Sequence, residues 1–251
     1  MVGSAERLER PVLDAILKAR SIRGGRYEAY KVVVTGRSLG AGTSCLLGML
    51  LNQNSGITLT VFAFAPPPVI TRTTHGEVAS GMLPGCTIHS FIHNADMIPR
   101  SSHYELVNLL AAVRCIDMLP WGQKDRSSTL LQGKLSSKQS AEIQEALSIR
   151  QAAAEALHKQ NKSVELVVPG NMYWLIPVDS SAKCAVEEGE DNTTDSVPSS
   201  TVSSYKLVHM KRDEDLFSGM YLTGDSMISD HSVSSYMDAI IRVDTSQMLF
   251  R

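Results

Sequence analysis

In the first part of the chain, apolar residues alternate between helical spacing and an unbroken run typical of a strand. Residues 5–20 place apolar side chains at helical intervals, which predicts an amphipathic helix that ends at Gly24-Gly25. Residues 32–34 form an unbroken β-branched run, which is typical of a strand buried on both faces of a parallel sheet. Apolar residues return to helical spacing over 44–51. The pattern therefore predicts a helix, a strand ending near Thr35 and a second helix.

The rest of the chain continues this alternation with shorter elements. Helices that alternate with buried strands indicate the α/β class, with a mostly parallel sheet flanked by helices. A parallel crossover needs a strand before its helix, and the first helix here has none, so we expect the sheet to lack its N-terminal strands. The further predictions are strands at 57–65, 87–92 and 205–209, helices at 104–119, 137–160 and after 231, and a hairpin of 164–168 and 172–176 around Pro169-Gly170.

A turn of small residues joins the first strand to the second helix. It reads Gly36-Arg37-Ser38-Leu39-Gly40, which fits the Gly-x-Ser-x-Gly pattern of a nucleophile elbow. A reactive serine must project from a sharply bent backbone, and Gly36 and Gly40 would give it clearance on both sides. The turn also opens a helix, so the amide of Leu39 would donate one hydrogen bond to an oxyanion.

The same glycines also suit two other interpretations. The spacing from Thr35 to Gly42 resembles a dinucleotide-binding turn, and a glycine-rich turn can be purely structural. Dinucleotide binding requires an acidic residue at the end of the next strand, to hold a ribose. That strand ends in Pro66-Pro67-Pro68 with no acid, which disfavours the dinucleotide interpretation.

Chain order supplies two partners for the serine. Asp96 follows the predicted strand 87–92, at the carboxyl edge of the sheet, where the working groups of open α/β sheets lie. His231 adjoins a predicted helix start in the last part of the chain. The order Ser38, Asp96, His231 is that of the triad in α/β-hydrolases. His93 and His103, which flank Asp96, remain weaker alternatives for the base.

Composition narrows the function classes. The chain has 251 residues, 43% of them hydrophobic, which suits a single domain over 1–251 with a helical insertion at about 101–163 and a flexible acidic loop at about 180–203. The net charge of −2 and the lack of a basic cluster argue against nucleic-acid binding. The insertion helix 137–160 suits a surface helix better than a lid over the site.

The sequence also shows little evidence for a metal site, a membrane span or a signal peptide. The four cysteines lack metal-ligand spacing, and the acids of the loop at 180–203 lack the spacing of a calcium loop, so no metal or cofactor is predicted. No apolar stretch approaches the roughly 20 residues of a membrane span, and residues 1–20 do not resemble a signal peptide. We therefore expect a cytoplasmic protein or one peripheral to a membrane.

Five ordered blocks resemble the class 3 (fungal-type) lipases and, within that family, the sn1-specific diacylglycerol lipases. The blocks are Val34-Thr-Gly-Arg-Ser-Leu-Gly-Ala-Gly42, Phe62-Ala-Phe-Ala-Pro-Pro-Pro68, Asp96-Met-Ile-Pro-Arg100, Val168-Pro-Gly-Asn-Met-Tyr173 and Met227-Ile-Ser-Asp-His231, continuing to Tyr236.

The resemblance implies a serine esterase that releases a fatty acid from diacylglycerol or a related acylglycerol at a membrane or lipid-droplet surface. Ser38 would be the nucleophile, His231 the base and Asp96 the orienting acid. The reaction requires no metal, although calcium influences some members of the family. The alternative is a catalytically impaired lipase-fold fragment that acts as a lipid-binding or interaction module.

The sequence departs from the lipase pattern in two ways. Arg37 replaces the histidine that precedes the nucleophile in the family, which changes local charge and bulk. The family's second oxyanion donor comes from a loop upstream of the first helix, and the chain starts just past it. We therefore expect the chain to be an N-terminally truncated form of a longer lipase.

Overall fold

The computed structural model describes residues 1–22, 27, 29–71, 82–102, 106, 110, 114, 122, 166–179, 202–210, 226–243 and 249–250. Its helices are α1 (Val2–Arg20), α2 (Leu39–Ser55), the 3-10 helix η1 (Ile98–Arg100), α6 (Ser226–Ser229) and α7 (Val233–Ile241). Its strands are β1 (Val32–Arg37), β2 (Leu59–Phe64), β3 (Ile70–Thr71), β4 (Met82–Leu83), β5 (Cys86–His93), β6 (Leu166–Val167), β7 (Asn171–Asp179), β8 (Val202–Met210) and β9 (Leu249–Phe250).

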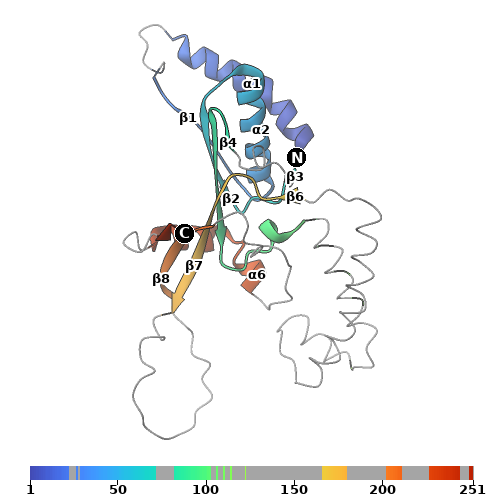
Figure 1. Ribbon diagram of the computed structural model, residues 1–251, viewed down its shortest axis with the longest axis vertical. Coiled ribbons are helices and arrows are strands. Elements are labelled where there is room, and N and C mark those ends of the chain that lie inside the picture. Colours follow the sequence, from blue (N-terminus) through green and yellow to red (C-terminus); the bar gives the residue numbers. More distant parts are fainter. Residues whose placement is uncertain are drawn as a thin grey trace, which may run out of the picture.

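A mostly parallel sheet forms the centre of the described structure (Figure 1). Its strands are hydrogen-bonded in the order β1-β2-β5-β7-β8-β9, with β4 attached to β5. Strands β1, β2, β5 and β7 run parallel, whereas β8 is antiparallel to β7. The predicted α/β class, with a mostly parallel sheet flanked by helices, is confirmed. The expected absence of N-terminal strands stays a prediction.

Helix α2 covers one face of the sheet because its apolar side meets the inward-facing residues of β1, β2 and β5. Helix α1 packs on α2 rather than on the sheet, and the two helices lie side by side in Figure 1. Gly48 allows the close approach of α2, since a Cβ there would come within 2.7 Å of the Val61 side chain. The predicted amphipathic helix at 5–20 is confirmed and begins earlier, at Val2.

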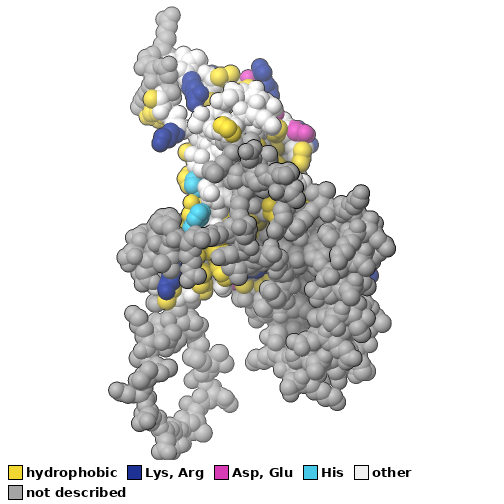
Figure 2. Space-filling view, viewed as in Figure 1, with side chains coloured by type: hydrophobic (Ala, Val, Ile, Leu, Met, Phe, Trp, Pro, Cys, Tyr) yellow, Lys and Arg dark blue, Asp and Glu magenta, His cyan; other side chains and the backbone are white. Residues whose placement is uncertain are grey.

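The opposite face of the sheet carries a row of aromatic rings. Phe62 stacks on His89, and Tyr173 contacts the rings of both His89 and His209. These side chains are half-buried, and Figure 2 shows histidine and hydrophobic side chains together on the surface. Helix α7 packs on this face, where the Tyr236 ring meets Phe64 edge-on. Helices therefore lie on both faces of the sheet.

The predicted hairpin around Pro169-Gly170 is wrong. Strand β6 pairs with β3, while β7 enters the large sheet beside β5. The reason lies in Gly170, whose φ of +80° turns the chain from one sheet into the other. A Cβ at Gly170 would overlap Ile88 of β5, so only glycine lets the chain pass this close to that strand.

Several sequence predictions fall outside the described residues. They are the helix 137–160, most of the helix 104–119, the insertion at about 101–163 apart from isolated positions, the acidic loop at about 180–203, and the end of the first helix at Gly24-Gly25. Within the described residues, no helix is both long enough and apolar enough to cross a membrane.

Candidate active site

Ser38 occupies a strained turn between β1 and α2. Its φ of 56° is positive, which is costly for a residue with a Cβ and is found mainly where the surroundings enforce it. Three main-chain hydrogen bonds hold this turn: the Ser38 amide donates to Phe64 O at 2.9 Å, and the Ser38 carbonyl accepts from Ala41 N at 2.9 Å and from Gly42 N at 3.2 Å. The helix thus starts at Leu39, earlier than the apolar spacing at 44–51 predicted.

Gly36 lets the strand and the helix meet at this turn. A Cβ on Gly36 would collide with Gly40 O and Ser44 Oγ and would lie 2.6 Å from Gly40 C. Ser44 Oγ in turn donates to Thr35 O at 3.1 Å, which binds the first turns of α2 to the end of β1. A Cβ on Gly40 would meet nothing within 4 Å, so the two glycines of the motif differ in their steric role.

The structure brings Ser38, Asp96 and His231 together. His231 Nε2 lies 3.1 Å from Ser38 Oγ, and His231 Nδ1 lies 3.0 and 3.1 Å from the two carboxylate oxygens of Asp96. A carboxylate only accepts, so Nδ1 carries the proton and Nε2 presents a lone pair to the serine hydroxyl. This tautomer is the one that can remove a proton from Ser38.

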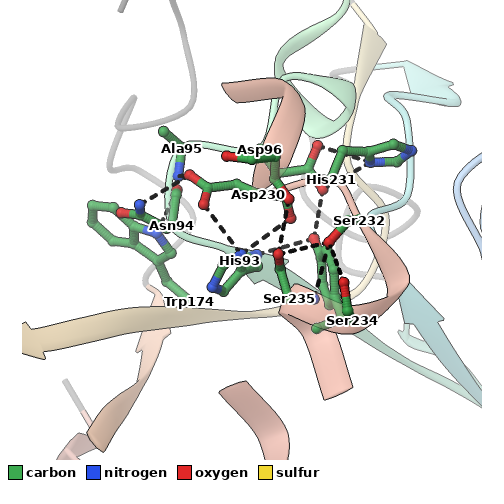
Figure 3. A network of polar contacts seen from close by, with 12 residues as sticks. His93, Asn94, Ala95, Asp96, Trp174, Asp230, His231, Ser232, Ser234 and Ser235 are labelled. Atoms are coloured by element: carbon green, nitrogen blue, oxygen red, sulfur yellow. Dashed lines mark hydrogen bonds and ion pairs between the residues drawn. The ribbon is translucent and has the colours of Figure 1, made fainter. Parts of the chain in front are cut away.

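Each of the three side chains comes from a different turn. Ser38 follows β1, Asp96 lies between β5 and η1, and His231 lies between α6 and α7. The side chains of Asp96 and His231 face one another in Figure 3. The grouping depends on the parallel sheet, because β1 and β5 end at the same edge.

Asp96 is completely buried, and hydrogen bonds surround its carboxylate. Oδ1 accepts from Ile98 N at 2.9 Å, and Oδ2 accepts from the Tyr236 hydroxyl at 2.7 Å. The Tyr236 hydroxyl also accepts from His93 N at 3.0 Å, so both of its roles are used. Burial, followed by the negative charge of Asp96, raises the pKa of Tyr236 well above its usual range, which keeps this hydroxyl a donor.

The other predicted positions of the motif lie close by. Leu39 is the first residue of α2, so its amide belongs to the helical turn whose N–H groups have no acceptor within the helix. Arg37 pairs with Phe64 in the sheet, and its Nε is buried without a hydrogen-bond partner among the described residues. Neither position contributes a side chain to the Ser38–His231–Asp96 contacts.

Of the alternative histidines, His93 is described, and its hydrogen bond is made to Asp230 rather than to the serine. His93 is buried, and its Nδ1 lies 3.1 Å from the main-chain oxygen of Asp230. His103 lies outside the described residues. Tyr236 and Asp230, which contact Asp96 and the turn before it, belong to a block that resembles the lipases, but the sequence assigned neither of them a role of its own.

No candidate metal centre is found in the described part of the chain. No group of three or more His, Cys, Asp or Glu side chains there is arranged to hold an ion. The described contacts instead join a serine hydroxyl, an imidazole and a carboxylate, with the N-terminus of α2 beside the serine.

Comparison with known proteins points to lipases. The family model described as Lipase (class 3) matches residues 7–105. Among solved structures, a lipase from Rhizopus microsporus var. chinensis is 25% identical, with 40% of this chain and 34% of that chain covered and a TM-score of 0.34. The M37 lipase is 19% identical, with 49% and 33% covered and a TM-score of 0.25.

The extent of these similarities is limited. The matched part of the chain spans about a third of the length of each solved lipase. No curated protein matches the chain. The family match covers Ser38 and Asp96 but stops before His231. Over residues 7–105 the chain is therefore similar to class 3 lipases.

Proposed function

We propose that the chain is a serine ester hydrolase that acts on acylglycerols, with a preference for diacylglycerol. The observation that carries this proposal is the pair of contacts made by His231, at 3.1 Å to Ser38 Oγ and 3.0 Å to Asp96 Oδ1. Nucleophile and base within hydrogen-bond reach, with the base held by a third group, define nucleophilic catalysis at an acyl carbon.

The proposed reaction has two stages. Ser38 Oγ attacks the ester carbonyl while His231 Nε2 takes its proton, and the resulting imidazolium then gives that proton to the departing alcohol oxygen. A water molecule, deprotonated by the same nitrogen, then attacks the acyl carbon; the bond to Ser38 Oγ breaks, Oγ takes the proton back from His231, and the fatty acid leaves. Asp96 holds the imidazole in its Nδ1–H tautomer and stabilises the imidazolium.

The N-terminus of α2 would stabilise the tetrahedral intermediate. The Leu39 amide follows the nucleophile directly and is one oxyanion donor in this proposal, reinforced by the positive end of the helix dipole. A second donor from an upstream loop, expected from the family pattern, remains part of the proposal. Loss of one such donor typically lowers the rate by about 10²–10³-fold.

Apolar side chains near the triad in the sequence support a lipid substrate. Leu39 follows the nucleophile, Ile228 and Val233 flank His231, and all three side chains are well exposed. Exposed apolar residues of this kind suit contact with acyl chains and with a membrane or droplet surface. A site for a water-soluble metabolite would instead present mainly polar groups. Calcium has no role in the proposed steps, and an influence of calcium is an expectation from family resemblance alone.

A fluorophosphonate probe tests the proposal, since it phosphorylates only an activated serine and releases fluoride. We expect the wild-type protein to be labelled on Ser38 and to release fatty acid from diacylglycerol vesicles. Both activities should disappear in Ser38→Ala and His231→Ala. The matched control is Ser55→Ala, at the exposed end of α2, which should behave as wild type.

The same experiment separates the alternative function. A wild-type protein that is folded and binds the vesicles, but is neither labelled nor active, would be a lipid-binding module rather than an enzyme. Vesicles that carry radiolabel at the first or the second acyl position would show which ester bond is cut.

A further inference from the structure

Asp230 joins the two turns that carry Asp96 and His231. Its Oδ2 accepts a hydrogen bond from Asn94 Nδ2 at 2.9 Å and another from Ala95 N at 3.1 Å. Asp230 directly precedes His231, and Ala95 directly precedes Asp96. Asp230 Oδ2 therefore connects the residue before His231 to the residue before Asp96 (Figure 3).

His93 adds a third link between the same two turns. Its Nδ1 lies 3.1 Å from the main-chain oxygen of Asp230, and a carbonyl only accepts, so Nδ1 carries a proton. His93 Nε2 is buried without a hydrogen-bond partner among the described residues, so this side chain supports Asp230 through Nδ1 alone.

The β5 side of this linkage is itself firmly anchored. Asn94 N donates to Leu175 O at 2.9 Å, and Trp174 Nε1 donates to Asn94 O at 2.9 Å, so both main-chain groups of Asn94 bind β7. Asn94 has a φ of 39°, a conformation that asparagine adopts more readily than most residues. The turn after β5 is therefore held in place by β7, and Asp230 attaches the α6–α7 turn to it.

We infer that Asp230 is a positioning residue for the proposed ester hydrolysis, which sets the distance between His231 and Asp96 by holding their turns together. It acts through its neighbours and touches neither Ser38 nor His231 with its side chain in the contacts described. The inference rests on the proposed function. Without the linkage the α6–α7 turn could shift, and a displacement of about 1 Å at a catalytic group can lower a rate by about 100-fold.

The Asp230 carboxylate is buried and its two oxygens differ in their contacts: Oδ2 accepts both hydrogen bonds, whereas Oδ1 lies 3.7 Å from His93 Nδ1. Only 8% of the residue is exposed, and burial raises the pKa of its carboxyl, while the hydrogen bonds from Ala95 and Asn94 act in the opposite direction. Both of these bonds end on the same oxygen. The amide oxygen of an asparagine at this position could accept both of them without carrying a charge.

A pair of substitutions at Asp230 separates position from charge. Asp230→Ala leaves the half-buried donors at Asn94 and Ala95 without their acceptor, and we expect kcat on a small soluble ester to fall about 10- to 100-fold with KM changed less than about 2-fold. Asp230→Asn keeps the acceptor and should stay within about 3-fold of the wild-type kcat. The matched control is Asp238→Ala, whose exposed carboxylate pairs with Arg242 on α7 and which should leave kcat unchanged.

Each outcome of these measurements either supports or contradicts the inference. Equal losses in Asp230→Ala and Asp230→Asn would show that charge matters and would overturn the inference, as would a wild-type kcat in Asp230→Ala. If Asp230→Ala does not fold, Asn94→Gly removes one of the two hydrogen bonds while suiting the positive φ. A kcat several-fold lower in that variant supports the inference, and an unchanged kcat contradicts it.

A spectroscopic readout separates this inference from the proposed function. The proton shared by His231 Nδ1 and Asp96 gives a far-downfield proton NMR signal, assigned by its loss in His231→Ala. We expect the signal in wild type and Asp230→Asn and its loss through exchange in Asp230→Ala, whether or not the protein cleaves esters. An inactive wild type with this pattern would refute the esterase and keep the positioning role, whereas an unchanged signal in Asp230→Ala would refute the positioning role.

Discussion

Replacement of Gly36 by alanine tests whether tight packing at the elbow positions the nucleophile. Ordinary van der Waals contact begins at 3.4 Å, and the new Cβ would lie 2.6 Å from Gly40 C, so this backbone must retreat by about 0.8 Å. Side-chain rotation cannot relieve this overlap, because the contacts include main-chain atoms in the first turn of α2. The movement would carry Ser38 with it.

The energetic cost can be assembled from the structure. Overpacking typically costs about 1–3 kcal/mol. Separation of Ser44 Oγ from Thr35 O removes a hydrogen bond of 3.1 Å worth about 1 kcal/mol, while alanine returns about 0.4–1 kcal/mol by restricting the unfolded chain. The net loss for Gly36→Ala is about 1–3.5 kcal/mol, which corresponds to a fall in Tm of about 2–14 °C for a chain of this length.

Two measurements on Gly36→Ala check this reasoning. Thermal unfolding followed by circular dichroism gives the change in Tm, and the rate of fluorophosphonate labelling reports on Ser38. We expect labelling about 100-fold slower than in wild type, since the nucleophile leaves the reach of His231. The matched control is Gly40→Ala, whose Cβ meets open space within a helix, so its Tm should equal or exceed that of wild type. Equal Tm values for the two variants would refute the packing argument.

Two further predictions concern buried groups away from the serine. Burial raises the pKa of Cys45 to about 12 and that of Cys86 to about 11, so neither thiol should react with iodoacetamide at pH 8 unless the protein is first unfolded in urea. Because the unfolded thiols ionise near pH 9, the free energy of unfolding should decrease as the pH rises from about 9 towards 12, as denaturant titrations at several pH values would show. Tyr236→Phe removes the donor to Asp96, and we expect kcat to fall about 10-fold with little change in KM; an unchanged kcat would show that the remaining donors suffice.

Local sequence signals predicted the strand–turn–helix at Ser38, because β-branched residues, small residues and helical spacing each act within a few positions. Asp96 and His231 were predicted from chain order and family resemblance, and the structure places both within hydrogen-bond distance of one another. Their catalytic roles remain proposals until the labelling experiment is done.

Interactions between distant segments explain what sequence did not reveal. The Pro169-Gly170 turn has the composition of a hairpin, but its strands join different sheets because a parallel position beside β5 is available to β7. Similarly, Tyr236 and Asp230 acquire their roles from contacts about 140 residues away, at Asp96 and Asn94. No pattern within a short window encodes such contacts.

The sheet itself determines where the site forms. The described non-glycine residues with positive φ each follow a parallel strand directly: Ser38 after β1, Ala65 after β2 and Asn94 after β5. The amide of each donates to a carbonyl of the adjacent strand, through Ser38 N to Phe64 O, Ala65 N to Phe91 O and Asn94 N to Leu175 O. Left-handed conformations cost about 1–3 kcal/mol each and persist only where the surroundings enforce them. The hydrogen-bond ladder thus continues one residue past each strand and fixes the turns that carry Ser38 and Asp96. The register of the sheet consequently sets the positions of Ser38 and Asp96, while hydrogen bonds of side chains such as Asp230 connect the α6–α7 turn that carries His231 to the turn after β5.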